Sequence, residues 1–553
     1  MLAGSTALTG TRAEGVPAET APERARAWAY RHAFQLGVGA VAAGLAAFLG
    51  LQAIQWPPHE DETLVFFVSR QPLGEVFSTV FEERGGAPLH FLLAHFVSSG
   101  WSSLTGLRLI SMVFAVASVP IMAALVARLT DRWTALVAVA IAAASWMVVY
   151  HGIYARMYSL FLFTSALSFL LLLRALERRG RRHWVAWALA TLAAIATQPY
   201  GAFVLVASVV FVLVRRRWAP TPLRRPLLSF AAVFLLALPL WLVYRVLADR
   251  FDVGVTGTSG SKLGSPVDVL TYLVQVAGDF SAGWKPVVAV VLVVAFAGIV
   301  TLARTQADAA ALAAAVILVP TAAFLLIRSG GSVSLESRHL IFALPFFSML
   351  VAAGLFRIAR LGRGWAPVLL VVGLGALLSA EVAWGWHRTP WMYGGEPAVR
   401  KAARDEAASW LAATTRPDDV GFGYEPLFLD ALEKGAPIGK VIVQRADPGL
   451  ALDTLSEADK PLGRGVWIFD ATDQLDASKQ RFTVPSVSPG PQFDVRAFGP
   501  LLVVRTKKPT LTAETFLRDT AVVEYQGKLI GIGDAGLNYQ TAVTALARLQ
   551  KNQ

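Results

Sequence analysis

The sequence predicts an α-helical polytopic membrane protein, with about eleven transmembrane helices and a C-terminal soluble α/β domain. Only 16% of the 553 residues are charged and 55% are hydrophobic, whereas roughly 25% of residues are charged in ordinary soluble domains. Eleven charge-poor runs are long enough to be candidate spans. Near residue 388 the composition changes, and from there on charge density is normal and Pro and Gly are frequent.

The N-terminal segment predicts a tail followed by a membrane anchor. Residues 1–27 are rich in Gly, Ala, Thr, Pro and Glu and have no apolar periodicity, which is typical of disorder. A basic collar and then the apolar run 34–54 follow, and this run is expected to remain as a signal anchor. We therefore divide the chain into a cytoplasmic tail (1–33), a transmembrane domain (34–387) and an extracytoplasmic domain (388–553).

Ten further apolar runs follow the first: 107–127, 133–150, 157–173, 184–198, 200–214, 227–246, 286–302, 309–327, 339–356 and 366–385. Lys and Arg gather in alternate loops, while the opposite loops include the acidic stretch 55–106, so the alternation supports this count. It predicts a cytoplasmic N-terminus and an external C-terminus, and the chain, rich in Ala and Arg, suggests a bacterial plasma membrane. Alternatively, 184–198 and 200–214 form one broken helix.

The composition excludes several classes of function. The chain has no cysteine, so disulfides, thiolate metal sites and cysteine nucleophiles are excluded. The net charge of +12 comes from short arginine runs between apolar stretches, which suits topology control and argues against a nucleic-acid partner. No phosphate-binding GxxxxGK[ST] loop is present, and the glycine pattern at 531–536 lies too near the C-terminus to begin a dinucleotide-binding unit.

The last third of the chain predicts a domain of alternating strands and helices. Expected strands are Asp419–Tyr424, Lys440–Gln444, Gly465–Phe469 and Leu501–Arg505, with helices over 397–413 and 538–551. Such a domain either binds an acceptor glycan or a partner, or braces the helical bundle.

The long loop after the first span predicts helices that lie on the membrane. Leu73, Val76, Phe77, Val80 and Phe81 follow the spacing of one helical face, with polar residues between them. Apolar stretches at 64–68 and 89–97 flank this amphipathic segment and are expected to lie beside it. The arrangement suggests a substrate that is partly embedded in lipid.

Three consecutive carboxylates, Glu60, Asp61 and Glu62, stand immediately after the first span. A carboxylate that is partly desolvated at this depth is a natural general base for an acceptor hydroxyl. The structural alternative is that Asp61 caps a helix and that the helix dipole favours Glu62.

Four short motifs then occur in order along the chain: Asp61-Glu62, and the segments 87–93, 154–160 and 336–345. Together with the single span before them, they resemble glycosyltransferase superfamily C over residues 30–385. The closest likeness is to enzymes that use polyprenyl-phosphate sugars, such as protein O-mannosyltransferases and the lipid A aminoarabinose transferase. The resemblance implies that Asp61 is the catalytic base that deprotonates the acceptor, that Glu62 beside it orients the acceptor or the base, and that no cofactor is needed.

The motifs also depart from the family pattern. Relatives often carry Glu where this chain has Tyr154, and an acidic residue where it has His151. We assign both residues, together with His90 and Tyr158, to the acceptor or donor pocket.

A lipid-phosphate leaving group requires cations at the outer mouth of the bundle. Arg156 and Arg338 adjoin apolar runs on the expected outer side, where an arginine is costly unless it is paired or used. The alternative is that they snorkel to lipid headgroups. His339 is expected either to bind the same phosphate or to be a packed histidine.

A metal site is not expected. His90 and His95 are five residues apart and do not share a helical face, and no HExxH motif occurs. An alternative is a magnesium or calcium ion held by Asp61, Glu62 and the donor phosphate.

These observations predict a membrane glycosyltransferase that moves a sugar from a polyprenyl phosphate to a hydroxyl of a glycan, lipid or protein, with inversion and without metal. The alternatives are a transporter or flippase of lipid-linked sugars, for which charged or broken helices at the bilayer midplane would be expected, and a noncatalytic scaffold.

Overall fold

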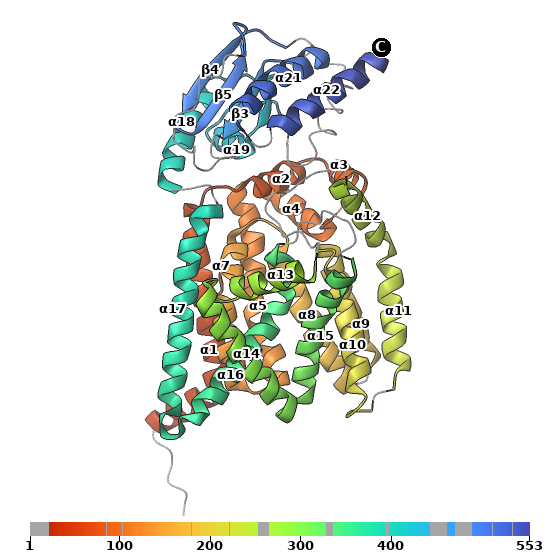
Figure 1. The fold of residues 1–553 in the computed structure, drawn as a ribbon, viewed down its shortest axis with the longest axis vertical. Coiled ribbons are helices and arrows are strands. Elements are labelled where there is room, and N and C mark those ends of the chain that lie inside the picture. The colour runs from red at the N-terminus through yellow and green to blue at the C-terminus, as the bar shows by residue number, and fades with distance from the viewer. Residues whose placement is uncertain are drawn as a thin grey trace, which may run out of the picture.

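The computed structural model describes the chain from residue 21 to residue 552, apart from residues 85, 102, 179, 221, 253–264, 328–335, 393–396, 443–461, 471–488, 511, 533 and 534. A long helical bundle carries a smaller α/β domain at one of its ends, and short helices lie between the two (Figure 1). Residues 1–20 of the expected N-terminal tail lie outside the described residues, and residues 21–33 are helical and form the start of α1.

The bundle consists of long apolar helices. They are α1 (Ala21–Gln55), α5 (Leu104–Leu129), α6 (Arg132–Ala144), α7 (Trp146–Ile153), α8 (Tyr158–Arg178), α9 (Arg181–Thr197), α10 (Gly201–Arg215), α11 (Arg224–Leu236), α12 (Leu238–Asp252), α14 (Lys285–Thr305), α15 (Ala307–Ile327), α16 (Leu344–Leu361) and α17 (Ala366–Met392). All eleven expected spans fall on these helices. Residues 184–198 and 200–214 form two helices, α9 and α10, rather than one broken helix.

Among the described residues, seven helices are long and apolar enough to cross a membrane, or nine if α6 with α7 and α11 with α12 each form one bent span. The bends measure 56° and 44° respectively. Helices α9 and α10, which have 17 and 15 residues, are not among these candidate spans. The predicted fold class is confirmed, whereas the number eleven stays a prediction.

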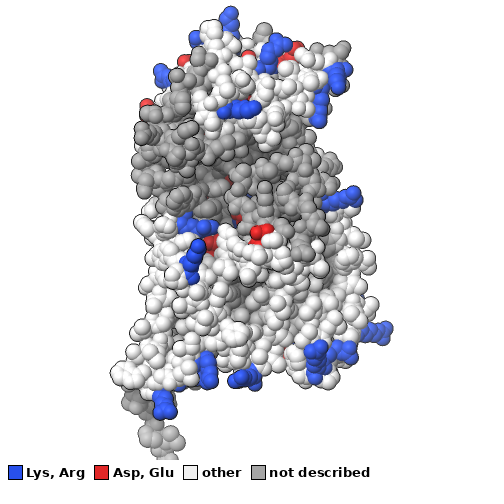
Figure 2. All heavy atoms as spheres, in the orientation of Figure 1, with Lys and Arg blue, Asp and Glu red and all other residues white. Residues whose placement is uncertain are grey.

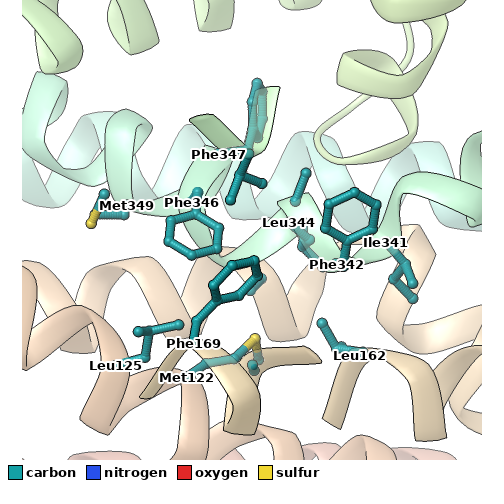
Figure 3. Close-up of a cluster of buried hydrophobic side chains, with 14 of the residues drawn as sticks. Met122, Leu125, Leu162, Phe169, Ile341, Phe342, Leu344, Phe346, Phe347 and Met349 are labelled. Atoms are coloured by element: carbon teal, nitrogen blue, oxygen red, sulfur yellow. The ribbon is translucent and has the colours of Figure 1, made fainter. Parts of the chain in front are cut away.

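Aromatic packing joins the middle of the bundle. Phe346 of α16 meets Phe169 of α8 edge to face, with ring centroids 5.1 Å apart, and Met122 and Leu125 of α5 lie beside them (Figure 3). These side chains are at most 1% exposed. The three helices therefore form a rigid centre on which the surrounding helices pack.

Two glycines let α14 and α16 pack closely. A Cβ atom on Gly298 would lie 1.9 Å from the carbonyl oxygen of Leu350, and one on Gly354 would lie 2.0 Å from that of Val294. Any larger residue would push the two helices apart. This is the small-residue packing typical of membrane helices.

Charged side chains mark the two ends of the bundle. In the view of Figure 2 a broad uncharged band crosses its middle, and Lys and Arg side chains gather below it. Helices α5, α8, α10, α14 and α16 all end there with an arginine in the last turn. We call this the basic end, and we call the opposite end, next to the α/β domain, the site end.

Short helices cover the site end. They are α2 (Glu60–Ser69), α3 (Leu73–Ser78), the π-helix η1 (Thr79–Arg84) and α4 (Pro88–Gly100), while α13 (Pro266–Asp279) and the 3₁₀ helix η2 (Ser337–Ala343) come from later in the chain. The expected amphipathic helix is present, but it changes from α to π geometry at Thr79. Val76 and Val80 are buried, whereas Leu73 and Phe77 are exposed.

The C-terminal domain is a five-stranded mixed sheet between two layers of helices. The strand order is β2-β1-β3-β5-β4. Strands β2, β1 and β3 are parallel to one another, and β5 pairs antiparallel with both β3 and β4. The strands are β1 (Val420–Gly423), β2 (Lys440–Ile442), β3 (Gly465–Asp470), β4 (Phe493–Phe498) and β5 (Leu501–Thr506). Helices α18 (Pro397–Thr414) and α19 (Glu425–Glu433) pack on one face, and α21 (Ala513–Leu529) and α22 (Ala535–Asn552) on the other.

This domain contacts the bundle through α19. Leu429 of α19 is buried in the same apolar cluster as Leu64 and Val65 of α2, and Phe67 of α2 packs against the core on the α19 side of the sheet. The helix that carries Asp61 is therefore held between the bundle and the C-terminal domain.

Candidate active site

Asp61 lies in the first turn of α2, directly after the first span. His59 caps this helix, because its Nδ1 accepts a hydrogen bond from the backbone N–H of Asp61 at 3.1 Å. The N–H of His59 donates to Glu62 Oε2 at 2.9 Å and completes a capping box. The cap residue is thus His59 rather than Asp61, and the Asp61 carboxylate is directed to partners from other elements.

Glu62 is sealed inside the protein and paired with an arginine. Its side chain has 0% exposure and that of Arg108 has 3%, and Nε and Nη2 of Arg108 donate to its two oxygens at 3.0 and 2.7 Å. The backbone N–H of Ala155 donates to the same carboxylate at 2.9 Å. Glu62 therefore connects α2, α5 and the loop before α8.

Arg108 also holds the end of the first span. It donates to the carbonyl oxygens of Ala53, Trp56 and Pro57, each at 2.8 Å. Arg108 was not singled out from the sequence. Its position inside the apolar run 107–127 was the available signal, since a charge within a span needs a partner.

Three expected site residues converge on Asp61. The hydroxyl of Tyr154 donates a hydrogen bond to Asp61 Oδ2, and Nη1 of Arg338 lies 3.4 Å from the same oxygen. Nη1 of Arg338 also donates to the Tyr154 hydroxyl at 3.2 Å, while Nη1 of Arg156 donates to the backbone carbonyl of Asp61 at 3.4 Å. The Asp61 side chain is 18% exposed, so an outside group has access to it.

Tyr154 acts here as a hydrogen-bond donor. Burial, and then the negative charge of Asp61, raise the pKa of its hydroxyl well above the ordinary value. The hydroxyl therefore keeps its proton at neutral pH. Where relatives often carry a second carboxylate, this chain places a neutral donor against Asp61.

Arg338 stands at the start of η2 between an acid and two aromatic rings. Its Nη2 donates to Glu336 Oε1 at 2.7 Å, and its guanidinium lies 5.1 Å from the centre of the Tyr158 ring. The side chain is 14% exposed and turns toward Asp61. The contact of Arg338 with Asp61 favours a role in the site over snorkelling to lipid headgroups.

His339 faces a different set of partners. Its ring stacks on Tyr200 with centroids 4.8 Å apart, and its Nδ1 accepts a hydrogen bond from the backbone N–H of Glu336 at 3.2 Å. These contacts fix the turn that carries Arg338. A packed histidine accounts for them, and its expected contact with phosphate stays a prediction.

The remaining expected pocket residues, His90, His151 and Tyr158, are buried. The ring of His151 lies 5.6 Å from Tyr154 and 4.7 Å from Tyr158. His90 of α4 is 1% exposed, and burial, together with the positive charge of Arg156, lowers its pKa to about 3. His90 is therefore neutral at physiological pH.

Metal-binding clusters are lacking in the part of the chain that the structure describes, where no group of three or more His, Asp or Glu side chains is placed to hold an ion. The polar site instead extends to Asp279, at the end of α13. Asp279 Oδ2 accepts from Ser337 Oγ at 2.5 Å and from Nη2 of Arg388 at 3.4 Å. Neither Asp279 nor Arg388 was singled out from the sequence.

The fold of this chain is similar to that of solved membrane glycosyltransferases. The crystal structure of ArnT from Cupriavidus metallidurans in the apo state matches with a TM-score of 0.53 and 15% identity, over 87% of this chain and 98% of that one. The oligosaccharyltransferase of Archaeoglobus fulgidus matches with a TM-score of 0.52 and 11% identity, over 80% of this chain and 70% of that one. The same archaeal enzyme, solved with an inhibitory peptide and a dolichol-phosphate, matches with a TM-score of 0.50 and 12% identity, again over 80% and 70%.

The chain is thus a multi-span membrane protein with the fold of glycosyltransferase superfamily C, and the resemblance seen in its motifs is confirmed. Within that class, residues 87–244 match the family described as dolichyl-phosphate-mannose-protein mannosyltransferase. No curated protein sequence matches the chain.

Proposed function

We propose that the protein transfers a sugar from a polyprenyl-phosphate donor to an acceptor hydroxyl at the site end of the bundle, on the outer face of the membrane. The convergence of Tyr154 and Arg338 on the accessible carboxylate of Asp61 is the observation that carries this proposal. The match to a family named for a lipid-phosphate sugar supports the donor class. So does the dolichol-phosphate bound to an archaeal enzyme of the same fold.

In this mechanism Asp61 accepts the proton of the acceptor hydroxyl while the acceptor oxygen attacks the anomeric carbon. The bond between that carbon and the phosphate oxygen breaks, and its electron pair leaves with the polyprenyl phosphate. Direct displacement inverts the anomeric configuration, because a single base suffices and no carboxylate needs to attack the sugar. Glu62 keeps α2 in place through Arg108 and does not touch the substrate.

The cations act on the leaving group. Arg338 lies at 3.4 Å from Asp61, and a donor phosphate that arrives between Arg338 and Arg156 competes with the carboxylate for this guanidinium. As Arg338 turns to the phosphate, Asp61 loses a positive neighbour and becomes a stronger base. Donor binding therefore activates the base, and His339 steadies the turn that carries Arg338.

The test is a transfer assay on the purified protein with a panel of polyprenyl-phosphate sugars. The assay compares the parent protein with Asp61→Asn and with a matched control, Glu514→Gln. The control removes a carboxylate charge on α21 of the C-terminal domain. We expect the Asp61 variant to lose about 100-fold or more in rate, as removal of a general base does, and the control to keep the parent rate. Equal transfer by Asp61→Asn would exclude Asp61 as base, and no release of lipid phosphate from any donor would exclude the proposed function.

A further inference from the structure

Helix α17 carries a polar face in its half nearest the site end. Glu381, Trp384 and Arg388 are three and four residues apart, so they share one side of the helix. Most of α17 is exposed, yet Glu381 is 0% exposed, so this side points into the bundle. Gly385 lies one turn beyond Glu381, and a Cβ there would be 3.6 Å from Trp146 of α7. Trp146 therefore covers this face.

Several buried polar atoms around this face lack a hydrogen-bond partner within the described residues. They are both carboxylate oxygens of Glu381, Nε1 of Trp146 and of Trp384, Nδ1 of His151 and Nε of Arg388. Native interiors leave few polar groups unsatisfied, and an ionisable side chain inside a span marks a functional site by default. Packing alone does not account for a cluster of this kind.

The chemistry of these atoms narrows the ligand. The two indole N–H groups and Arg388 donate hydrogen bonds, whereas the carboxylate of Glu381 accepts them. A phosphate offers only acceptors and so gives the oxygens of Glu381 no hydrogen bond, and a simple cation accepts none from the indole and guanidinium N–H groups. A sugar ring offers hydroxyl groups, which both donate and accept, and apolar C–H groups that pack against aromatic side chains.

The polar face of α17 is joined directly to the site around Asp61. Arg388 donates to Asp279, which also accepts from Ser337, the residue before Arg338. The guanidinium of Arg388 lies 4.5 Å from the centre of the Trp146 ring.

A second connection runs through His151. Its ring lies 6.1 Å from Trp146 on one side and 4.7 Å from Tyr158 on the other. His151 therefore connects Trp146, which covers the polar face of α17, with Tyr158, whose ring lies against Arg338.

We propose that Glu381, Trp384 and Arg388 form the subsite that recognises the hydroxyl groups of the sugar on the donor lipid. The inference rests on the proposed function and deepens it. Glu381 accepts a hydrogen bond from a sugar hydroxyl, and Arg388 and the indole of Trp384 donate to others. These residues make and break no covalent bond, and they determine which sugar is bound.

The first experiment measures thermal unfolding in detergent without lipid. Glu381→Leu and Glu381→Gln are compared with the parent and with Val382→Leu, a change at a neighbouring position that is 64% exposed. A carboxyl group kept for a ligand contributes nothing to the free protein, so we expect both Glu381 variants to unfold at or above the parent midpoint. A lower midpoint for both variants would assign Glu381 to the fold and overturn the subsite.

The second experiment measures binding of decaprenyl phosphate, bare or carrying mannose, glucose or N-acetylglucosamine. We expect the parent to bind at least one glycosylated lipid more tightly than the bare one, and Glu381→Gln to lose about 10-fold or more of that affinity, equal to about 1.4 kcal/mol. Its affinity for bare decaprenyl phosphate should stay at the parent value, as should both affinities in Val382→Leu.

The outcomes separate the two proposals. Unchanged affinity of Glu381→Gln for the glycosylated lipid, or a parent that binds bare and glycosylated lipids equally, would overturn the subsite and leave the proposed donor class standing. A parent that binds none of the four lipids would overturn the proposed function and the subsite with it.

Discussion

Two adjacent carboxylates of α2 have opposite surroundings. Asp61 is 18% exposed and faces Tyr154 and Arg338, whereas Glu62 is sealed against Arg108. The difference arises because successive residues of a helix point about 100° apart, so that one faces the site and the other faces α5. A partly accessible carboxylate suits proton transfer, and a sealed ion pair suits structural support.

This contrast predicts different effects of neutralising each acid. Glu62→Gln removes the carboxylate that forms the buried ion pair with Arg108, and breaking such a buried pair costs about 3–5 kcal/mol. We expect a marked fall in the thermal unfolding midpoint, whereas Asp61→Asn should change the midpoint little and abolish transfer. The double variant Glu62→Gln with Arg108→Met, which removes the stranded charge, should recover part of the loss. A Glu62→Gln protein as stable as the parent would contradict the structural role.

His90 predicts a dependence of stability on pH. Its pKa is lowered to about 3 by burial and by the charge of Arg156, while an unfolded chain takes up a proton near pH 6.5. Between these two values the unfolded state binds more protons than the folded state, so the free energy of unfolding decreases as pH falls from about 6.5 toward 3, by at most about 1.4 kcal/mol per pH unit. Chemical denaturation of parent and His90→Leu across this range should give a shallower slope for the variant. Identical slopes would contradict the shift.

The residues around Asp61 were predicted from the sequence, but Arg108 and Asp279, which hold the neighbouring Glu62 and Ser337 in place, were not. Asp61, Tyr154, Arg156 and Arg338 stand in short motifs, which a resemblance can carry over. Arg108 is a single charge inside an apolar run, and Asp279 stands at the end of a helix. Only the packing of distant helices shows that these two residues contact Glu62 and Ser337. Glu381 gave the same weak signal as Arg108, namely one charge inside an expected span.

At the scale of elements, strands with continuous apolar character were predicted and a strand with mixed character was not. The expected strands coincide with β1, β2, β3 and β5 within a few residues. The edge strand β4 was missed, because its sequence Phe-Asp-Val-Arg-Ala-Phe buries its two ends and exposes residues between them. Its pairing with β5 fixes it, and pairing partners are not visible in a local pattern.

The turn η2 is held by Asp279 at the end of α13, which accepts a hydrogen bond from Ser337. Because Arg338 follows Ser337, we expect a change at Asp279 to affect donor binding. Asp279 holds Ser337 and Arg388, and the side chain that follows Ser337 is Arg338. Asp279→Asn keeps the size but weakens both contacts, so we expect the KM for the donor to rise several-fold, with a smaller change in kcat. Measurement of both constants for parent, Asp279→Asn and Asp279→Glu, in which the carboxylate is kept, tests this positioning role. A fall in kcat with unchanged KM would contradict it.

At the scale of the whole molecule, the helix that carries Asp61 is enclosed between two domains. Leu429 of α19 packs on α2 from the side opposite the bundle, and Arg108 and Ala155 hold α2 from below. The C-terminal domain therefore braces the site whatever else it binds. The sequence left open whether it braces the bundle or binds a partner, because the few apolar residues of α19 that meet α2 resemble ordinary core positions.

The two ends of the bundle predict the direction of the whole chain in the membrane. Arginines gather at the basic end, which the positive-inside rule places in the cytoplasm, and the C-terminal domain covers the other end (Figures 1 and 2). The natural absence of cysteine makes this testable, since a single introduced thiol is the only one in the chain. Arg182→Cys at the start of α9 and Arg518→Cys on α21 place that thiol at opposite ends, both at exposed positions. We expect a membrane-impermeant maleimide to label Arg518→Cys in intact cells and Arg182→Cys only after lysis. The reverse result would place Asp61 on the cytoplasmic side, where an outward-facing polyprenyl-phosphate sugar does not reach it.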